Sequence, residues 1–298
     1  MTDVPWPLRG VPHVLGDRGV ANVPCRPVWR VTEVPWWPAR RTLVRQIAGH
    51  RPAPACRLAP CSTLPMPSDP VDADLVLGLS AWVHDACRGF NASHDAEHAA
   101  QVHRLSELVL AADLPFASRD VQQAVRCAAW THDLCDRKLV SDVPAAAAHV
   151  ASTCRDLGAS AAAAKLAGTV VATMSFSARL RRFDAAVAHS GSAEALTKWG
   201  DPPGMTEVEL AVYRVVSDAD LLEAMGTVGV VRTFMYQATH NATPFSALLH
   251  TKGTLQRGQG FLFHPWARTE GVRRDAIMRE VCAEYRRERG ALALAGVA

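Results

Sequence analysis

The chain has 298 residues, of which 49% are hydrophobic and 20% are charged, and its formal net charge is +3. This length allows one large domain or two modest ones with a core that needs no disulfide bridges, so a peptide-sized or disulfide-scaffold protein is excluded. No run approaches the ~18 uninterrupted apolar residues of a membrane-spanning helix, and the first residues lack the basic patch and apolar stretch of a secretory signal. We therefore expect a globular protein that contacts no membrane and is cytoplasmic.

Residues 1–70 are predicted to form an irregular or disordered basic leader. Residues 1–68 hold nine arginines, no lysine and three acids, together with twelve of the nineteen prolines and four of the eight tryptophans. Proline removes backbone donors and biases the preceding residue toward extended conformations, so this composition disfavours regular structure. A basic, Trp-bearing arm for nucleic acid or an acidic partner is the alternative, but basic charge alone is weak evidence, and we expect no nucleic-acid partner.

Residues 71–290 are predicted to form one all-α domain, because alanine- and leucine-rich stretches alternate there with short Gly, Pro, Asn and Asp segments. We expect helices at residues 72–88, 95–112, 119–135, 143–156, 159–174, 206–224, 227–238 and 270–288. Loops are expected at residues 190–204 and 239–265. The eight cysteines form no C-x-x-C pair, and Cys56 and Cys61 lack the second pair of a structural zinc site, so most cysteines are expected to be reduced and buried.

Three segments of this helical domain combine histidine or aspartate with apolar flanks. In the first, His98 lies on the apolar, inward face of its predicted helix. In the second, the doublet His132-Asp133 ends an apolar helix, where burial costs free energy unless a partner satisfies the polar groups. In the third, Asp218 and Asp220 lie inside an apolar helix and need a partner for the same reason.

One divalent cation would satisfy all three segments. The set that would bind it is His98, His132, Asp133 and Asp220. Two imidazoles and two carboxylates suit manganese, iron, zinc or magnesium and leave coordination positions for water and substrate. The alternative is that each histidine is a satisfied core residue and each acid a cap or a surface charge. Because every member lies against an apolar helix face, the set as a whole favours a metal site.

These residues resemble the HD-domain superfamily of metal-dependent phosphohydrolases, and the resemblance covers residues 72–288. In that family the metal ligands are a first histidine, a His-Asp doublet after an Ala-rich helix, and an aspartate in an Asp-Ala-Asp-x-Leu-x-Ala-x-Gly helix. The matching positions here are His98, His132, Asp133 and Asp220. The segments Met174–Ser177 and 216–234 resemble the bacterial branch of nucleotide pyrophosphohydrolases and uncharacterised HD hydrolases.

The resemblance implies an HD-domain helical bundle that hydrolyses a phosphate or pyrophosphate bond of a small phosphorylated molecule such as a nucleotide. It also implies a divalent metal cofactor, with manganese favoured and magnesium, iron or zinc as alternatives. The chain departs from the family at Leu221 and Glu223, where arginine and aspartate are usual, and this bears on substrate contacts more than on metal binding. Arg179, Arg181 and Arg182 could grip a polyphosphate, although a solvated basic face is the commoner explanation.

Asp136 and Lys138 are the candidate catalytic residues. Asp136 follows His132 by four residues on the same helical face, and is expected to orient the attacking water or shuttle its proton; a surface acid is the alternative. Lys138 is expected to hold a phosphate, with a solvent-facing lysine as the alternative. Asp218 is expected to support a metal ligand by hydrogen bonding.

Two other functions fit parts of the sequence. The segment from His94 to His98, with Glu97, matches the H-x-x-E-H signature of inverted zinc metalloproteases, but it leaves the later doublet and the acids of the third segment unexplained. A non-catalytic HD-like module that binds a nucleotide or a protein partner, with a purely structural metal, is the second alternative. Turnover would distinguish an enzyme from such a module.

Overall fold

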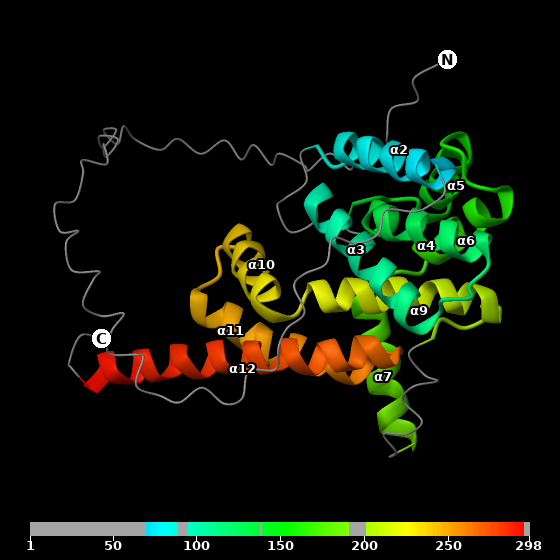
Figure 1. The fold of residues 1–298 in the computed structure, drawn as a ribbon. Coiled ribbons are helices and arrows are strands. Elements are labelled where there is room, and N and C mark those ends of the chain that lie inside the picture. Colours follow the sequence, from blue (N-terminus) through cyan, green and yellow to red (C-terminus); the bar gives the residue numbers. More distant parts are fainter. Residues whose placement is uncertain (1–69, 89–94, 138, 191–200, 295–298) are drawn as a thin grey trace, which may run out of the picture. The chain divides into compact units, whose positions relative to one another are not determined.

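The computed structural model describes residues 70–88, 95–137, 139–190 and 201–294. Every regular element within these ranges is a helix, and no β-strand occurs in them. The predicted all-α fold class is therefore confirmed (Figure 1). The predicted leader up to residue 69, Lys138, and the cysteines at positions 25, 56 and 61 lie outside the described residues.

The helices follow one another through short connections. In chain order they are α2 (Pro70–Ala86), α3 (Ala96–Asp113), α4 (Arg119–Thr131), the 3-10 helix η2 (His132–Cys135), α5 (Val143–Asp156), α6 (Ala161–Val171), α7 (Phe176–Ser190), α9 (Glu207–Glu223), α10 (Gly226–Thr239), α11 (Pro244–Gly253), the 3-10 helix η3 (Leu255–Phe261) and α12 (Pro265–Leu294). Side-chain caps mark several starts: Ser118, Ser160 and Thr243 each accept a hydrogen bond from the backbone N–H three residues on. Helix α9 begins with a capping box formed by Thr206 and Glu209.

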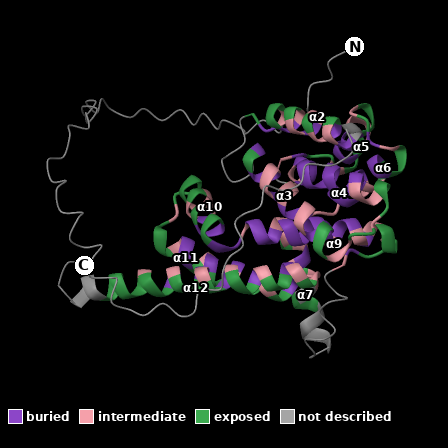
Figure 2. Ribbon diagram, in the orientation of Figure 1, coloured by how far each residue is buried: buried purple, intermediate pink, exposed green. Residues whose placement is uncertain are grey.

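Helix α4 lies at the centre of the bundle. All of its residues from Gln123 to Thr131 are buried, and α2, α3, α6 and α9 pack against it (Figure 2). The small side chains of Ala124, Ala128 and Ala129 let these neighbours approach closely. Because α4 leads directly into His132, this buried helix fixes the position of the His-Asp doublet.

A polar network is buried beside α4. The Arg126 guanidinium lies 2.9 Å from the Asp72 carboxylate on α2 and 2.9 Å from the Glu107 carboxylate on α3. Asp72 also accepts a 2.7 Å hydrogen bond from Gln123 Nε2, and Gln123 Oε1 accepts a 3.0 Å bond from the backbone N–H of Ser160. The network therefore joins α2, α3, α4 and the start of α6 inside the core.

The C-terminal third of the chain is more regular than predicted. The expected loop at residues 239–265 instead contains α11 and η3, and α12 extends beyond the predicted 270–288. Helix α7 also falls outside the predicted helices. In α11 the buried residues are Ala247, Leu248 and Thr251, too few to give a clear apolar period, and the usable signal was the capping residue Thr243 followed by Pro244.

The composition-based expectations agree with the described part of the chain. The cysteines there, Cys87, Cys127, Cys135, Cys154 and Cys282, are free and buried, as predicted. None of the described helices is by itself long and apolar enough to cross a membrane, and α6 with the first turns of α7 meets the length and composition requirement only as a pair bent by 66°.

Candidate metal centre

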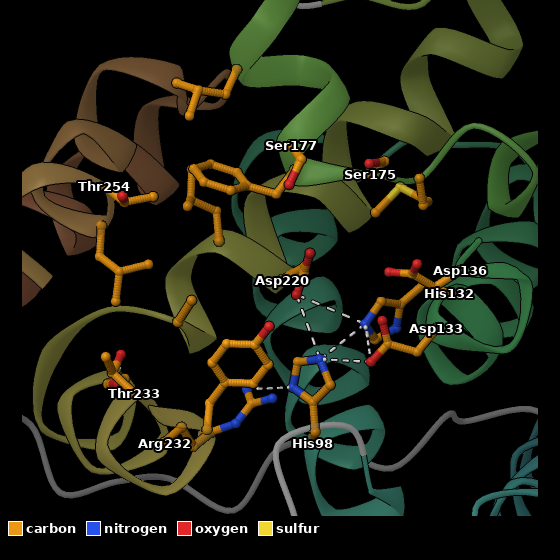
Figure 3. Close-up of a pocket in the computed structure, with 18 of the residues that line it drawn as sticks. His98, His132, Asp133, Asp136, Ser175, Ser177, Asp220, Arg232, Thr233 and Thr254 are labelled. Carbon is orange, nitrogen blue, oxygen red and sulfur yellow. Dashed lines mark hydrogen bonds and ion pairs between the residues drawn. The ribbon is translucent and has the colours of Figure 1, made fainter. Parts of the chain in front are cut away.

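The structure brings the four predicted ligands together from three elements (Figure 3). His98 comes from the first turn of α3, His132 and Asp133 from η2, and Asp220 from the last turn of α9. His98 Nε2 lies 3.0 Å from His132 Nε2, 3.4 Å from Asp133 Oδ2 and 3.5 Å from Asp220 Oδ1. His132 Nε2 lies 3.5 Å and 3.8 Å from the same two carboxylate oxygens. His98, His132 and Asp220 therefore form one compact set of ligand atoms, and Asp133 Oδ2 approaches both histidines from η2.

Local structure explains why these side chains point at one another. Asp95 caps α3 and accepts a 3.0 Å hydrogen bond from the backbone N–H of His98, which fixes the first turn of that helix. Helix α4 ends at Thr131, and the chain tightens into a 3-10 turn, in which the Asp136 N–H bonds to the Asp133 carbonyl at 3.0 Å. The predicted helix at 119–135 is thus correct in extent but changes its geometry at the functional doublet.

The protonation of the two histidines favours a cation at this point. His132 Nδ1 lies 2.9 Å from the Ala129 carbonyl oxygen, which can only accept, so Nδ1 carries the proton and the Nε2 lone pair faces the cluster. Burial lowers the pKa of His98 to about 3, against the opposing effect of the Asp133 carboxylate. His98 is therefore a neutral imidazole near pH 7, the form that binds metals.

The spacing also fits a metal. Atoms held ~2.1 Å from a cation at octahedral or tetrahedral angles lie about 3.0–3.4 Å apart, and the distances within the cluster are close to this range. The ligand atoms of His98, His132 and Asp220 all lie within 4.8 Å of one another. The side chains of Asp133 and Asp220 are 19% and 29% exposed, so the cluster is open to solvent on the carboxylate side. The cluster can hold a divalent metal with room for water or substrate.

The candidate catalytic acid Asp136 lies on the wall of an adjoining pocket. Its backbone is extended (φ −64°, ψ 130°), because η2 ends at Cys135. Asp136 therefore does not share a helical face with His132, contrary to the prediction. Both side chains nevertheless line the pocket and lie near each other (Figure 3). The second candidate, Lys138, lies outside the described residues.

Asp218 does not have the predicted role. Its carboxylate is fully buried and accepts bonds from the backbone N–H groups of Phe263 (2.9 Å) and His264 (2.8 Å). His264 Nδ1 lies 2.9 Å from the same carboxylate. Asp218 therefore attaches the segment before α12 to α9 rather than supporting a metal ligand.

An open pocket of about 470 Å³ extends from the cluster between α7, α10 and α11. The basic side chains on its walls are Arg137, Arg181 and Arg232, and apolar side chains such as Phe176 and Leu255 line another part. A site with guanidinium groups and an apolar area beside a metal cluster suits a ligand with an anionic and a flat, apolar end.

Arg181 is the one member of the predicted arginine group that lines this pocket. Arg179 is buried, hydrogen-bonds to the Phe261 carbonyl and stacks 4.2 Å above the Phe263 ring. Arg182 donates a 3.2 Å bond to the Tyr213 hydroxyl. Of the three arginines considered as polyphosphate-binding residues, only Arg181 lies on the pocket wall.

Sequence reasoning missed the pocket residues Tyr236, His250 and Thr254. Two of these lie in the region predicted as a loop, and Figure 3 shows Thr254 across the pocket from Asp136. Burial lowers the pKa of His250, so this side chain is a neutral hydrogen-bonding group near pH 7. The pocket wall at His250 and Thr254 is therefore polar, and His250 adds no positive charge to it near pH 7.

The metalloprotease alternative has little support in the structure. His94, the first histidine of that signature, lies outside the described residues, and the described helix that carries His98 begins at Ala96. The signature requires two histidines one turn apart on one helix. Glu97, its proposed general base, is exposed. The look-alike doublet His84-Asp85 is likewise exposed on α2.

The first turn of α10 needs a glycine at position 229, where it passes the end of α9. A Cβ there would lie well inside van der Waals contact with the Ala224 carbonyl, whose backbone cannot move away easily. Gly229→Ala is therefore expected to displace the start of α10 and to lower the free energy of unfolding by about 1–3 kcal/mol in urea titrations. Gly253→Ala, where an added Cβ meets nothing within 4 Å, is the control and should not destabilise the protein. Equal stability of the two variants would contradict the tight turn.

The fold of this chain is similar to that of several solved structures. No family model matches the chain, and no curated protein sequence matches it. Among solved structures, Bacillus subtilis YpgQ in complex with ADP is similar over 72% of this chain and 97% of its own, with a TM-score of 0.52 and 22% identity. An HD-superfamily hydrolase from Bacillus thuringiensis is similar over 74% and 99% of the two chains, with a TM-score of 0.51 and 18% identity. A protein from Lactobacillus plantarum is similar over 73% and 97%, with a TM-score of 0.52 and 18% identity.

The chain has the same fold as these structures, one of which is an HD-superfamily hydrolase. The predicted resemblance is confirmed at the level of the fold. Within the HD fold of this chain, the His/Asp cluster lies where α3, η2 and α9 meet and opens into the pocket.

Proposed function

We propose that this chain is a metal-dependent phosphohydrolase that cleaves a phosphate ester or phosphoanhydride bond of a nucleotide. The observation that carries the proposal is the convergence of two imidazole nitrogens and two carboxylate oxygens at the mouth of a pocket with guanidinium groups on its walls. The ADP bound in the similar Bacillus subtilis structure supports a nucleotide ligand. The HD-superfamily hydrolase fold supports hydrolysis.

The proposed cofactor is a divalent cation held by His98, His132, Asp133 and Asp220, with manganese favoured by the mixed nitrogen and oxygen donors. When bound, such a cation lowers the pKa of a water molecule and offsets the charge that develops on a phosphoryl group. The remaining chemistry is assigned to side chains of the pocket.

Asp136 is proposed to orient the attacking water and to accept its proton, because its carboxylate lies on the pocket wall beside His132. Arg137 and Arg181 are proposed to bind phosphate oxygens, since guanidinium groups donate paired hydrogen bonds to them. The apolar part of the pocket would then hold the base. A phosphate-binding role for Lys138 and a cytoplasmic location remain proposals from the sequence.

The proposal predicts turnover of at least one nucleotide in the presence of Mn²⁺. We expect wild-type protein to hydrolyse a member of a panel of nucleoside mono-, di- and triphosphates, with products resolved by chromatography. Asp133→Ala should lose this turnover by more than ~100-fold, because a charged ligand of the cation is removed. The identity of the products would show which bond is cleaved.

His84→Ala is the matched control, since it alters an exposed His-Asp doublet on α2 that is not part of the cluster, and it should keep wild-type turnover. Unchanged turnover in Asp133→Ala would reject the metal centre. Metal binding by wild type without turnover of any panel member would favour the non-catalytic binding module.

A further inference from the structure

The second ring nitrogen of His98 has two neighbours of opposite chemistry. Glu223 Oε2 lies 3.2 Å from His98 Nδ1, and Arg232 Nη1 lies 2.7 Å from the same atom (Figure 3 shows the arginine contact). Glu223 and Arg232 also form an ion pair with each other. The Glu223 side chain is 4% exposed and that of Arg232 is 18% exposed, so water screens neither contact strongly.

The two neighbours favour different tautomers of His98. A guanidinium N–H can only donate, so the contact with Arg232 favours a lone pair on Nδ1 and a proton on Nε2. That proton would point into the ligand cluster, where His132 Nε2 is 3.0 Å away, and would block a cation. A carboxylate accepts, and Glu223 Oε2 is buried without a hydrogen bond 3.2 Å from this nitrogen, so a proton on Nδ1 would satisfy it and leave the Nε2 lone pair free.

The other histidine of the cluster does not face this competition. His132 Nδ1 points to the backbone carbonyl of Ala129, which side-chain substitution cannot remove. A backbone carbonyl therefore sets the metal-binding tautomer of His132, whereas a side chain sets that of His98. Side-chain substitution can disturb only the tautomer of His98.

We infer that Glu223 is a positioning residue that holds His98 in the tautomer required for metal binding. It does so by accepting the Nδ1–H hydrogen bond and by pairing with Arg232, which would otherwise stabilise the opposite tautomer. The inference rests on the proposed metal site. Helix geometry supports it, because Asp220 and Glu223 are three residues apart on α9, so one helical turn supplies both a ligand and the group behind another ligand.

A double-mutant cycle on Mn²⁺ affinity tests this role in the full chain. We expect Glu223→Leu to weaken Mn²⁺ binding, measured by isothermal titration calorimetry, by about 10–100-fold, the usual cost of losing a group behind a metal ligand. Arg232→Met should change the affinity by less than about threefold. The double variant Glu223→Leu with Arg232→Met should recover most of the lost affinity, because the competing donor is gone. A purely structural role of Glu223 predicts no such recovery.

The tautomer can also be observed directly. In Zn²⁺-loaded protein with ¹⁵N-labelled histidine, wild type should show a protonated Nδ1 at His98. In Glu223→Gln, whose side chain keeps its size but loses its charge, we expect a weakened Nδ1–H signal and an intermediate Mn²⁺ affinity. This conservative variant serves in place of Glu223→Leu if circular dichroism shows that the leucine variant is unfolded.

Three outcomes would overturn the inference. Wild-type affinity in both Glu223 variants would do so, as would a double variant that binds Mn²⁺ no better than Glu223→Leu. Absence of Mn²⁺ binding in wild type would overturn the proposed metal site itself, and the inference with it. The first two results leave the metal site standing, so the two failures are distinguishable.

Discussion

Asp220→Ala is expected to weaken Mn²⁺ binding by more than ~100-fold, beyond the ~10–100-fold cost of losing a group behind a ligand. The variant removes a carboxylate whose Oδ1 lies 3.5 Å from His98 Nε2 and 3.8 Å from His132 Nε2. The remaining ligands are two neutral imidazoles and the Asp133 carboxylate, which offset only one of the two charges of a divalent cation. Hydrolysis of the nucleotide found in the substrate panel should fall together with metal content, which equilibrium dialysis with elemental analysis would measure.

The fold should survive this substitution. The Asp220 side chain is 29% exposed, so its truncation leaves no large cavity. Glu207→Ala is the matched control, because it removes an exposed carboxylate at the other end of the same helix and should retain metal and turnover. Full metal content in Asp220→Ala would remove this aspartate from the set of ligands.

Arg126→Ala is expected to lower the free energy of unfolding by about 3–5 kcal/mol, because removing one partner of a buried ion pair leaves an uncompensated charge. The Arg126 side chain is 6% exposed, and that of its partner Asp72 is 7% exposed. The second partner, Glu107, would also lose its 2.9 Å contact. Urea unfolding followed by circular dichroism would measure the loss.

An exposed ion pair gives the comparison. Arg273 pairs with Glu270 within α12, but its side chain is 53% exposed, and such surface pairs contribute about 0–1 kcal/mol. Arg273→Ala should therefore change the free energy of unfolding by less than about 1 kcal/mol in the same urea titration. If Arg126→Ala lowered the free energy of unfolding by less than about 1 kcal/mol, the buried network would contribute little to stability.

The sequence was most informative where residues of unusual type stood in apolar surroundings. His98, His132, Asp133 and Asp220 could be chosen because charged or polar groups on apolar helix faces need a partner. The resemblance then supplied the fold that brings them together. The helices that form the core, such as α4, were predicted for the related reason that their apolar stretches are long.

The roles of buried acids could not be predicted in the same way. Asp218 is paired with backbone groups 45 residues further along the chain, and nothing local to Asp218 indicates this. Glu223 lies beside His98 because α9 packs against α3, and it meets Arg232 where α10 follows α9. Sequence spacing shows that an acid needs a partner but not which partner the tertiary fold provides.

The attachment made by Asp218 lies outside the pocket wall, so it is separate from the side chains that line the pocket. Asp218 lies two residues before the ligand Asp220 on α9. Its carboxylate accepts hydrogen bonds from the backbone N–H groups of Phe263 and His264. Because these are mainly backbone contacts, the partly exposed pocket side chains of His250 and Thr254 can change without breaking the attachment to α9. Substitutions at these two positions can therefore exchange the recognised ligand while the metal cluster stays intact. Such an arrangement makes them the natural target for directed evolution of new substrate preferences.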